Sequence, residues 1–201
     1  MVAVGSEVSR FKVGDAVFGT TGLRFGAYAE YSALPATSGG GVLAHKPTNL
    51  THEEAAGIPV GGLEALHFLI SAQIQPGERV LINGAGGSIG TLGVQLARYY
   101  GATVTAVDSV DKLPMLRSIG ADEVMDYQRE DFIRSGQQWD VIFDVTGKSP
   151  FGGCLRALKP GGRYLLSNAG LMASLRAHWP KDNGKRVILG TSAQVMDDLL
   201  F

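Results

Sequence analysis

The chain has 201 residues, of which 45% are hydrophobic and 18% charged, and its formal net charge is −1 at pH 7. This composition allows a sizeable core, and the near-neutral charge offers no basic field to nucleic acid or anionic lipid. The single cysteine, Cys154, excludes an intrachain disulfide and a cysteine-rich zinc cluster. No apolar run reaches the roughly 18 residues that span a bilayer, and the first residues lack a signal-peptide core. We expect a cytoplasmic protein that acts on a small molecule.

Residues 1–50 contain short, partly alternating stretches that are rich in β-branched and aromatic side chains. Antiparallel strands are predicted within FKVGDAVFG (11–19), GAYAEYSALPA (26–36) and VLAHKP (42–47), with a loop at SGGG (38–41). Three short strands cannot bury a core by themselves. This region therefore predicts part of a β domain.

A helical region is expected to begin at Thr51. Thr51 and Glu54 have the spacing of a capping box, in which each side chain satisfies a backbone amide at the helix start. Pro59 should interrupt this helix because proline cannot donate to the preceding turn. A second helix is predicted over 61–73. Its apolar face is predicted to carry Leu63, Leu66 and Ile70.

From residue 79 onward, apolar stretches alternate with helical patterns. Buried strands are predicted at 79–83, 103–108, 123–127, 140–146, 162–167 and 186–190. Helices are predicted at 88–100, 110–119, 130–135 and 150–158, the last ending in KPGG. Continuous apolar strands alternating with helices indicate parallel βαβ units whose sheet is covered on both faces. The prediction is an α/β fold: a doubly wound Rossmann sheet of six parallel strands in the order 3-2-1-4-5-6.

The segment INGAGGSIGTLGVQLAR (82–98) places four glycines within seven positions, between the first strand of this array and its first helix. A helix N-terminus there offers backbone N–H groups and a positive dipole to a pyrophosphate. Ala85-x-Gly87-x-x-Gly90 approximates the dinucleotide-binding fingerprint. Gly87 would let the phosphates approach the backbone, and Gly90 would let the helix pack closely on the strand. Asp108 ends the second strand, where an acidic residue binds the adenosine ribose.

Two other functions remain open from these residues. DVIFD (140–144) followed by LRALKPGGRYLLS (155–167) also fits an S-adenosylmethionine methyltransferase. The strand before the glycine loop, RVLIN (79–83), lacks the acidic residue usual in those enzymes, and no seventh, antiparallel strand is evident. The second alternative is a non-catalytic module for cofactor binding or assembly. The dinucleotide-binding interpretation ranks above both.

Six stretches, in this order along the chain, extend the pattern beyond the glycine loop. They are VGSEVSRFKVGDAVFG, GAYAEY, HKPTNLTHEEAAGIPVGGLEALHFL, GERVLINGAGGSIGTLGVQLAR, LRSIGADEVMDY and LKPGGRYLLS. With them the chain resembles the medium-chain dehydrogenase/reductase superfamily, in its zinc-independent quinone-oxidoreductase-like branch. The resemblance implies a partial GroES-like catalytic domain at 1–50 and a Rossmann domain at 51–201. It also implies NAD(P)H-dependent reduction of a quinone or an α,β-unsaturated carbonyl.

The sequence differs from the family in two ways. It differs from the zinc-dependent relatives at the positions of their zinc sites, and it differs from the family's usual length. TTGLRFG (20–26) stands where those relatives carry a structural zinc lobe, and Val60 stands near their catalytic zinc ligand. No zinc is expected, and His67 is predicted to be a half-buried packing residue. The family usually has further segments before and after the stretches matched here. We therefore expect a fragment that binds cofactor with little turnover, with exposed strand edges that favour self-association into a homo-oligomer.

The resemblance and the strand positions together imply the cofactor-binding residues, and no catalytic residue is assigned. The pyrophosphate would be bound by Gly84, Ala85, Gly86, Gly87, Ser88 and Ile89. The adenosine end would be held by Asp108, Ser109, Lys112 and Tyr127. The nicotinamide side would be lined by Val145, Thr146, Ser167, Asn168 and Ala169.

The expected cofactor is NAD or NADP. A carboxylate at Asp108 favours the NAD diol and repels a 2′-phosphate, whereas Lys112 resembles the lysine that reaches the NADP 2′-phosphate in related quinone reductases. Charge favours NAD. Glu64 is expected to face solvent, and Cys154 to fill space in the core.

Overall fold

The computed structural model describes residues 1–22, 26–35, 41–168, 182–190 and 196–200. The chain divides into two compact units, Met1–Leu63 with Ser192–Phe201, and Glu64–Thr191. Each unit is described by itself below. The domain boundary predicted between residues 50 and 51 stays a prediction.

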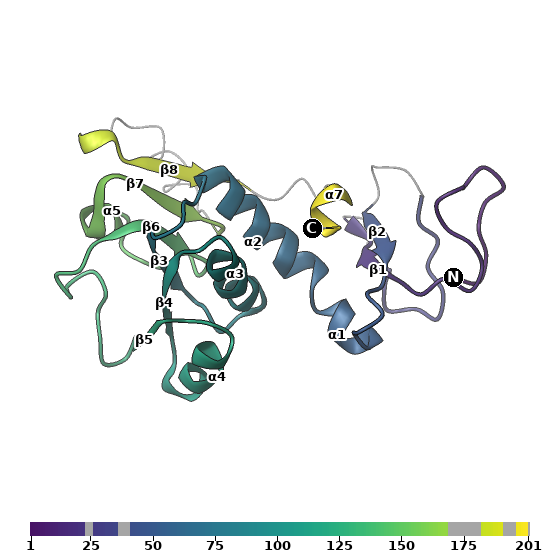
Figure 1. The fold of residues 1–201 in the computed structure, drawn as a ribbon, viewed down its shortest axis with the longest axis horizontal. Coiled ribbons are helices and arrows are strands. Elements are labelled where there is room, and N and C mark those ends of the chain that lie inside the picture. Colours follow the sequence, from purple (N-terminus) through teal and green to yellow (C-terminus); the bar gives the residue numbers. More distant parts are fainter. Residues whose placement is uncertain (23–25, 36–40, 169–181, 191–195, 201) are drawn as a thin grey trace. The chain divides into compact units, whose positions relative to one another are not determined.

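The larger unit is built on a six-stranded sheet (Figure 1). Its strands are β3 (Arg79–Asn83), β4 (Thr103–Asp108), β5 (Glu123–Asp126), β6 (Trp139–Asp144), β7 (Leu158–Leu166) and β8 (Arg186–Leu189). They lie in the order β5-β4-β3-β6-β7-β8, and every pairing is parallel. The predicted order 3-2-1-4-5-6 is therefore confirmed, as is the doubly wound fold class.

Successive strand residues point to opposite faces of the sheet, which produces two cores. Against one face pack α2 (Pro59–Ala72), α3 (Ser88–Tyr99) and α4 (Leu113–Ser118), with Ile82 and Phe143 contributed by the strands. The other core holds Leu81, Ile142 and residues of α5 (Phe151–Ala157). The η2 turn (Val110–Lys112) precedes α4, so the helix predicted at 110–119 begins with a tighter turn.

The predicted break at Pro59 is confirmed, because α1 (His52–Ala56) ends before it and α2 begins with it. Proline suits the first turn of a helix, where its missing N–H has no intrahelical partner to lose. Leu63 and Leu66 are buried as predicted, but the prediction for Ile70 is wrong because its side chain is 51% exposed. The helix buries Phe68 and Leu69 instead, and position 70 is turned away from them.

Two further predictions in this unit are wrong. Residues 130–135 form turns rather than a helix, because the Asp131 side chain accepts from the Ile133 N–H at 2.9 Å and closes a local turn. KPGG does not end a helix but lies within β7, where the pairing with β6 shifts its register between Trp139 and Val141.

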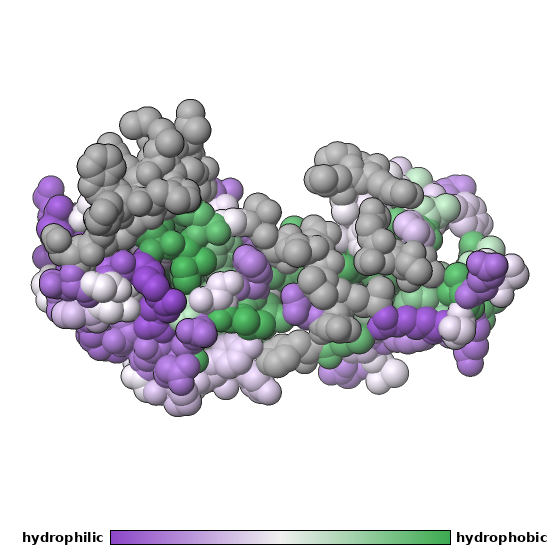
Figure 2. All heavy atoms as spheres, turned by 90° about the horizontal axis from the view of Figure 1, so that it is seen from above, coloured by the Kyte–Doolittle hydropathy of each residue, from purple (hydrophilic) through white to green (hydrophobic). Residues whose placement is uncertain are grey.

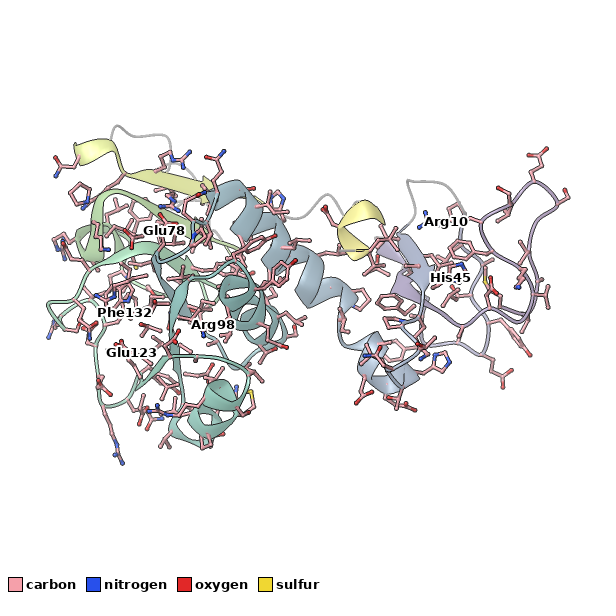
Figure 3. All side chains as sticks on the ribbon, viewed as in Figure 1. Arg10, His45, Glu78, Arg98, Glu123 and Phe132 are labelled. Atoms are coloured by element: carbon pink, nitrogen blue, oxygen red, sulfur yellow. The ribbon has the colours of Figure 1, made fainter. Side chains whose placement is uncertain are left out.

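A partly buried ion pair connects β7 to the turn that precedes β3. The Arg163 guanidinium donates to both Glu78 carboxylate oxygens at 2.8 and 2.6 Å, and to the Ala72 carbonyl at the end of α2 at 3.0 Å. Figure 3 shows Glu78 beside the sheet. This fork ties three segments together at the amino end of the strands.

The smaller unit contains a two-stranded antiparallel sheet of β1 (Val17–Thr20) and β2 (Val42–His45), with the short α1 and α7 (Met196–Leu199). This sheet is consistent with a partial GroES-like domain. In this unit the ring of His45 lies near Phe11, with centroids 5.1 Å apart, and its Nε2 donates to the Arg10 carbonyl at 3.3 Å (Figure 3).

The capping box predicted at the start of α1 is present, with both Thr51–Glu54 hydrogen bonds formed. The strand predicted within 26–36 is wrong for residues 26–35, which are irregular and expose Tyr28 and Tyr31. The loop predicted at 38–41 lies, apart from Gly41, outside the described residues.

The surface of the larger unit is mixed in character. Figure 2 shows a hydrophobic area, in green, among hydrophilic side chains on the face drawn. Large exposed hydrophobic side chains of this unit include Ile70, Tyr99, Val110, Met115 and Tyr127. Within the described ranges, no helix is long and apolar enough to cross a membrane.

Candidate functional site

Three glycines of the loop between β3 and α3 stand where a Cβ would meet close neighbours. Gly84 has φ +83°, and a Cβ there would lie 2.7 Å from Thr146 Cγ2. A Cβ at Gly86 would lie 2.9 Å from Asp108 Oδ2 and would also meet the Lys112 side chain. A Cβ at Gly90 would lie 2.5 Å from Ala85 Cα. The close packing predicted for Gly90 is therefore confirmed.

The N-terminus of α3 faces this loop without a side-chain cap. Its N-cap residue is Gly87, which has no side chain to cap the helix, and the Thr91 N–H donates to the Gly87 carbonyl at 2.8 Å. The amides of the first turn and the helix dipole thus form an electropositive concavity, which suits a phosphate group.

Asp108, the last residue of β4, connects the glycine loop to the next strand. Its Oδ2 accepts from the Gly86 N–H at 2.7 Å, its Oδ1 accepts from the Ser109 N–H at 2.9 Å, and Lys112 Nζ lies 3.4 Å from Oδ1. Burial raises the pKa of Asp108, but the two N–H donors and the Lys112 ammonium outweigh burial and leave the pKa below its usual value. The carboxylate is therefore ionised at neutral pH and carries its own counterion.

A cavity of about 650 Å³ opens at the carboxyl ends of β3, β4 and β6, where the strand order reverses. Its lining residues are Asn83, Gly84, Val107, Asp108, Tyr127, Glu130, Asp131, Phe132, Ile133, Thr146, Lys148, Ser149 and Pro150. Open α/β sheets bind their ligands at this position. The structure thus brings four sequence-predicted residues, Gly84, Asp108, Tyr127 and Thr146, to one cavity.

The other predicted residues lie around the cavity rather than in its lining. Ala85, Gly86, Gly87, Ser88 and Ile89 form the loop and the start of α3. Ser109 and Lys112 lie beside Asp108.

At the ends of β6 and β7, the Val145 carbonyl accepts from Asn168 Nδ2 at 2.7 Å and from Ser167 Oγ at 3.4 Å. Ala169 lies outside the described residues.

Sequence reasoning missed most of one wall of the cavity. That wall comes from the turn after β5, residues 130–133, and from residues 148–150 after β6. Phe132 anchors the turn by packing its ring edge-on to Trp139, with centroids 6.0 Å apart (Figure 3). Asn83 was also missed, although a polar residue that ends an otherwise apolar strand is a usable signal of a strand-end site.

The described residues contain no group of three His, Cys, Asp or Glu side chains that could hold a metal ion. Cys154 is fully buried, and burial raises the pKa of its thiol to about 11, so it is a poor metal ligand at neutral pH. His67 is half-buried against Phe68, as predicted.

The parallel sheet order, the close-packed glycine loop and the cavity at the strand reversal together define a Rossmann-type α/β domain. A family model described as zinc-binding dehydrogenase matches residues 88–177. Similar proteins include 2-methylene-furan-3-one reductase of Solanum lycopersicum, 35% identical over 83% of this chain and 44% of the relative. The NADPH-dependent alkenal/one oxidoreductase of Arabidopsis thaliana is 36% identical over 82% of this chain and 44% of the relative.

Solved structures agree with these relatives. The quinone oxidoreductase from Coxiella burnetii superposes with a TM-score of 0.85 at 28% identity, covering 99% of this chain and 62% of that one. The chain belongs to the medium-chain dehydrogenase/reductase superfamily. It spans about half the length of the curated relatives it matches.

Proposed function

We propose that this chain is the cofactor-binding part of a zinc-independent, NAD(P)H-dependent reductase of quinones or α,β-unsaturated carbonyls. The observation that carries the proposal is the glycine loop, whose backbone leaves no room for a Cβ at Gly90 and which faces a helix N-terminus that has no side-chain cap. The relatives' names, which include quinone and alkenal/one oxidoreductases, support the substrate class.

The residues of the site are proposed to bind and orient the dinucleotide. The loop Gly84–Ile89 would hold the pyrophosphate through the first-turn amides of α3 at Ser88 and Ile89, because the four preceding amides already donate to Val107, Asp108 and Gly84. Asp108 with Ser109, Lys112 and Tyr127 would hold the adenosine end. The strand ends at Val145, Thr146 and 167–169 would line the nicotinamide side. When bound, the dinucleotide supplies the hydride, so the protein needs to contribute orientation and exclusion of water rather than a nucleophile.

Residues 1–50 are proposed to be part of a GroES-like catalytic domain and residues 51–201 the Rossmann domain. Catalysis requires a substrate held against the cofactor in a dry cleft. A chain that spans about half of its relatives should bind cofactor with little turnover. Self-association and a cytoplasmic location remain predictions.

The proposed preference for NADH over NADPH depends on Asp108. Oδ1 already accepts from the Ser109 N–H and hydroxyl, whereas Oδ2 accepts from the Gly86 N–H and keeps one acceptor position for a ribose hydroxyl. The carboxylate also repels a 2′-phosphate. Lys112 reduces this repulsion because it neutralises Asp108 at 3.4 Å. We therefore expect a modest preference rather than exclusion of NADPH.

Calorimetry of the 201-residue chain with NADH, NADPH and S-adenosylmethionine tests the proposal. We expect binding of both nicotinamide cofactors and none of the methyl donor. Tighter binding of the methyl donor would refute the proposed function.

Asp108→Ser should narrow or reverse the difference in affinity between NADH and NADPH, and Lys112→Ala is the matched variant that removes the opposite charge. If Lys112→Ala strongly weakens NADPH while Asp108→Ser changes nothing, the NADH preference is wrong.

The described part of the sheet does not support the methyltransferase alternative. Every pairing between the described strands β3 to β8 is parallel, whereas those enzymes need an antiparallel strand. The binding-module alternative is tested by steady-state assay with NAD(P)H and a set of quinones and enones. Turnover near about 10 per second would contradict the expectation of little activity.

A further inference from the structure

Asp144, the last residue of β6, is a fully buried carboxylate that receives five hydrogen bonds. Asn83 Nδ2, Thr146 Oγ1 and the Gly147 N–H donate to Oδ1 at 3.0, 2.7 and 3.1 Å. The Ser149 N–H and the Tyr164 hydroxyl donate to Oδ2 at 3.2 and 3.0 Å. Both oxygens are therefore committed.

Among the residues that the structure describes, Asp144 has no cationic partner within ion-pair distance. A buried carboxylate without a counterion is costly, so its hydrogen bonds must offset the lost solvation. Hydrogen bonds to a charged group are stronger than those between neutral groups. The segments that donate to Asp144 are thus held firmly in place.

Three of the five donors come from the segment that follows β6, and a fourth comes from the end of β3. Asn83, Thr146 and Ser149 themselves line the cavity. The turn also depends on Gly147, which has φ +67° and whose Cβ would collide with the Asn168 backbone carbonyl. The buried carboxylate of Asp144 therefore holds two segments that line the cavity, the end of β3 and the 146–149 turn.

We propose that Asp144 is a positioning residue that fixes Asn83 and the 146–149 turn in the conformation that binds the dinucleotide. This inference rests on the proposed function. The geometry explains why a carboxylate is required. An asparagine at 144 would direct its own N–H groups either toward Asn83 and Gly147 or toward Ser149, and all three are N–H donors that need an acceptor.

Three variants of the 201-residue chain test this role. Asp144→Asn removes the acceptor, Gly147→Ala displaces the turn through its backbone, and Tyr164→Phe removes the donor that belongs to β7 and not to the cavity. The readouts are the affinity for NADH and NADPH by fluorescence titration, amide hydrogen exchange at Gly147 and Ser149, and the urea midpoint.

We expect Asp144→Asn and Gly147→Ala to weaken cofactor binding by about tenfold or more, the loss expected when hydrogen bonds to a charged group are broken. Both should speed exchange at the Gly147 and Ser149 amides. Tyr164→Phe should lower the urea midpoint and leave the cofactor affinity within about twofold. Should Asp144→Asn fail to fold, Gly147→Ala still tests whether cofactor binding needs the 146–149 turn in this conformation.

Wild-type affinity in both turn variants would overturn the proposal, as would an equal loss of affinity in Tyr164→Phe, because the role would then be general stability. If the wild-type chain binds neither dinucleotide, the proposed function fails. Amide exchange in Asp144→Asn would then still decide whether Asp144 holds the turn.

Discussion

Gly90→Ala is the sharpest test of the packing between the glycine loop and α3. The added Cβ would lie 2.5 Å from Ala85 Cα and 2.6 Å from Ala85 C, and still closer to the Gly84 carbonyl, whereas ordinary contacts begin at 3.4 Å. All three are backbone atoms, so no side chain can turn away. The start of α3 must move from the loop by about 1 Å.

The expected cost follows from two opposing contributions. Overpacking a well-packed site costs about 1–3 kcal/mol, and alanine is about 1 kcal/mol better than glycine within a helix. The free energy of unfolding should therefore fall by about 0–2 kcal/mol. Because the same displacement moves the amides of the first turn of α3, cofactor affinity should fall as well.

Gly93→Ala is the matched control on the same helix. Its Cβ would lie 3.5 Å from Ile82 Cδ1 and 3.6 Å from Phe143 Cε1, which are ordinary contacts. This variant should be neutral or up to about 1 kcal/mol more stable, with unchanged cofactor affinity. Urea denaturation and fluorescence titration of both variants measure the difference. The reasoning is refuted if Gly90→Ala is as stable as Gly93→Ala and binds the cofactor equally well.

Three further predictions concern buried and partly buried groups of the larger unit. With a thiol pKa of about 11, Cys154 is ionised to only about a thousandth at pH 8, so iodoacetamide should label it in urea but not in the folded chain; rapid labelling of the folded chain would show that it is accessible. Glu78→Gln should lower the free energy of unfolding by about 2 kcal/mol, since it breaks the fork with Arg163; an unchanged urea midpoint would show that the fork contributes nothing.

The third of these concerns acid. Burial raises the pKa of Glu78, Asp108 and Asp140, but their hydrogen-bond and cationic partners hold each below its usual value. The resulting stability is present above about pH 4.5 and lost as the pH falls through the folded pKa values. The urea midpoint should drop between pH 5 and pH 3, and a constant midpoint would contradict these assignments.

The sheet of the larger unit was predictable because its strands carry their own signal. Strands covered on both faces read as continuous apolar runs, as in RVLIN and TVTAVD, and each predicted run became a strand. The helices predicted between these strands, several of which end at a glycine, indicated that neighbouring strands run parallel. The misses were local, such as the turn at 130–135, where an Asp131 side chain satisfies the backbone in place of a helical bond.

The smaller unit was less predictable, since alternation alone does not make a strand. GAYAEYSALPA alternates, but a strand needs a partner for its backbone groups, and residues 26–35 form none in the part of the chain that is described. The aromatic residue Tyr28 favoured the strand prediction because aromatic side chains often cover the buried face of a strand. Here its side chain is almost fully exposed, so it lies on no buried face.

The candidate site divides in the same way. The glycine loop was predictable because the positive φ of Gly84 and the close backbone contacts at Gly90 both require glycine. The opposite wall of the cavity has no comparable sequence signal, because Phe132 and Lys148 lie in turns that many residue types can form. The role of Asp144 could not be predicted from the sequence, because its five hydrogen-bond donors come from segments far apart in the chain as well as from its own turn.

Asp108 combines both kinds of information, and its two roles determine how the cofactor experiment is interpreted. The residue was assigned to the ribose by its position, yet its Oδ2 also holds the Gly86 N–H at 2.7 Å. Asp108→Ser will therefore loosen the loop that binds the pyrophosphate common to NADH and NADPH. Because that loss weakens both cofactors alike, it cancels in the ratio of their affinities. The ratio, rather than either affinity alone, isolates the charge that discriminates the ribose from its 2′-phosphate.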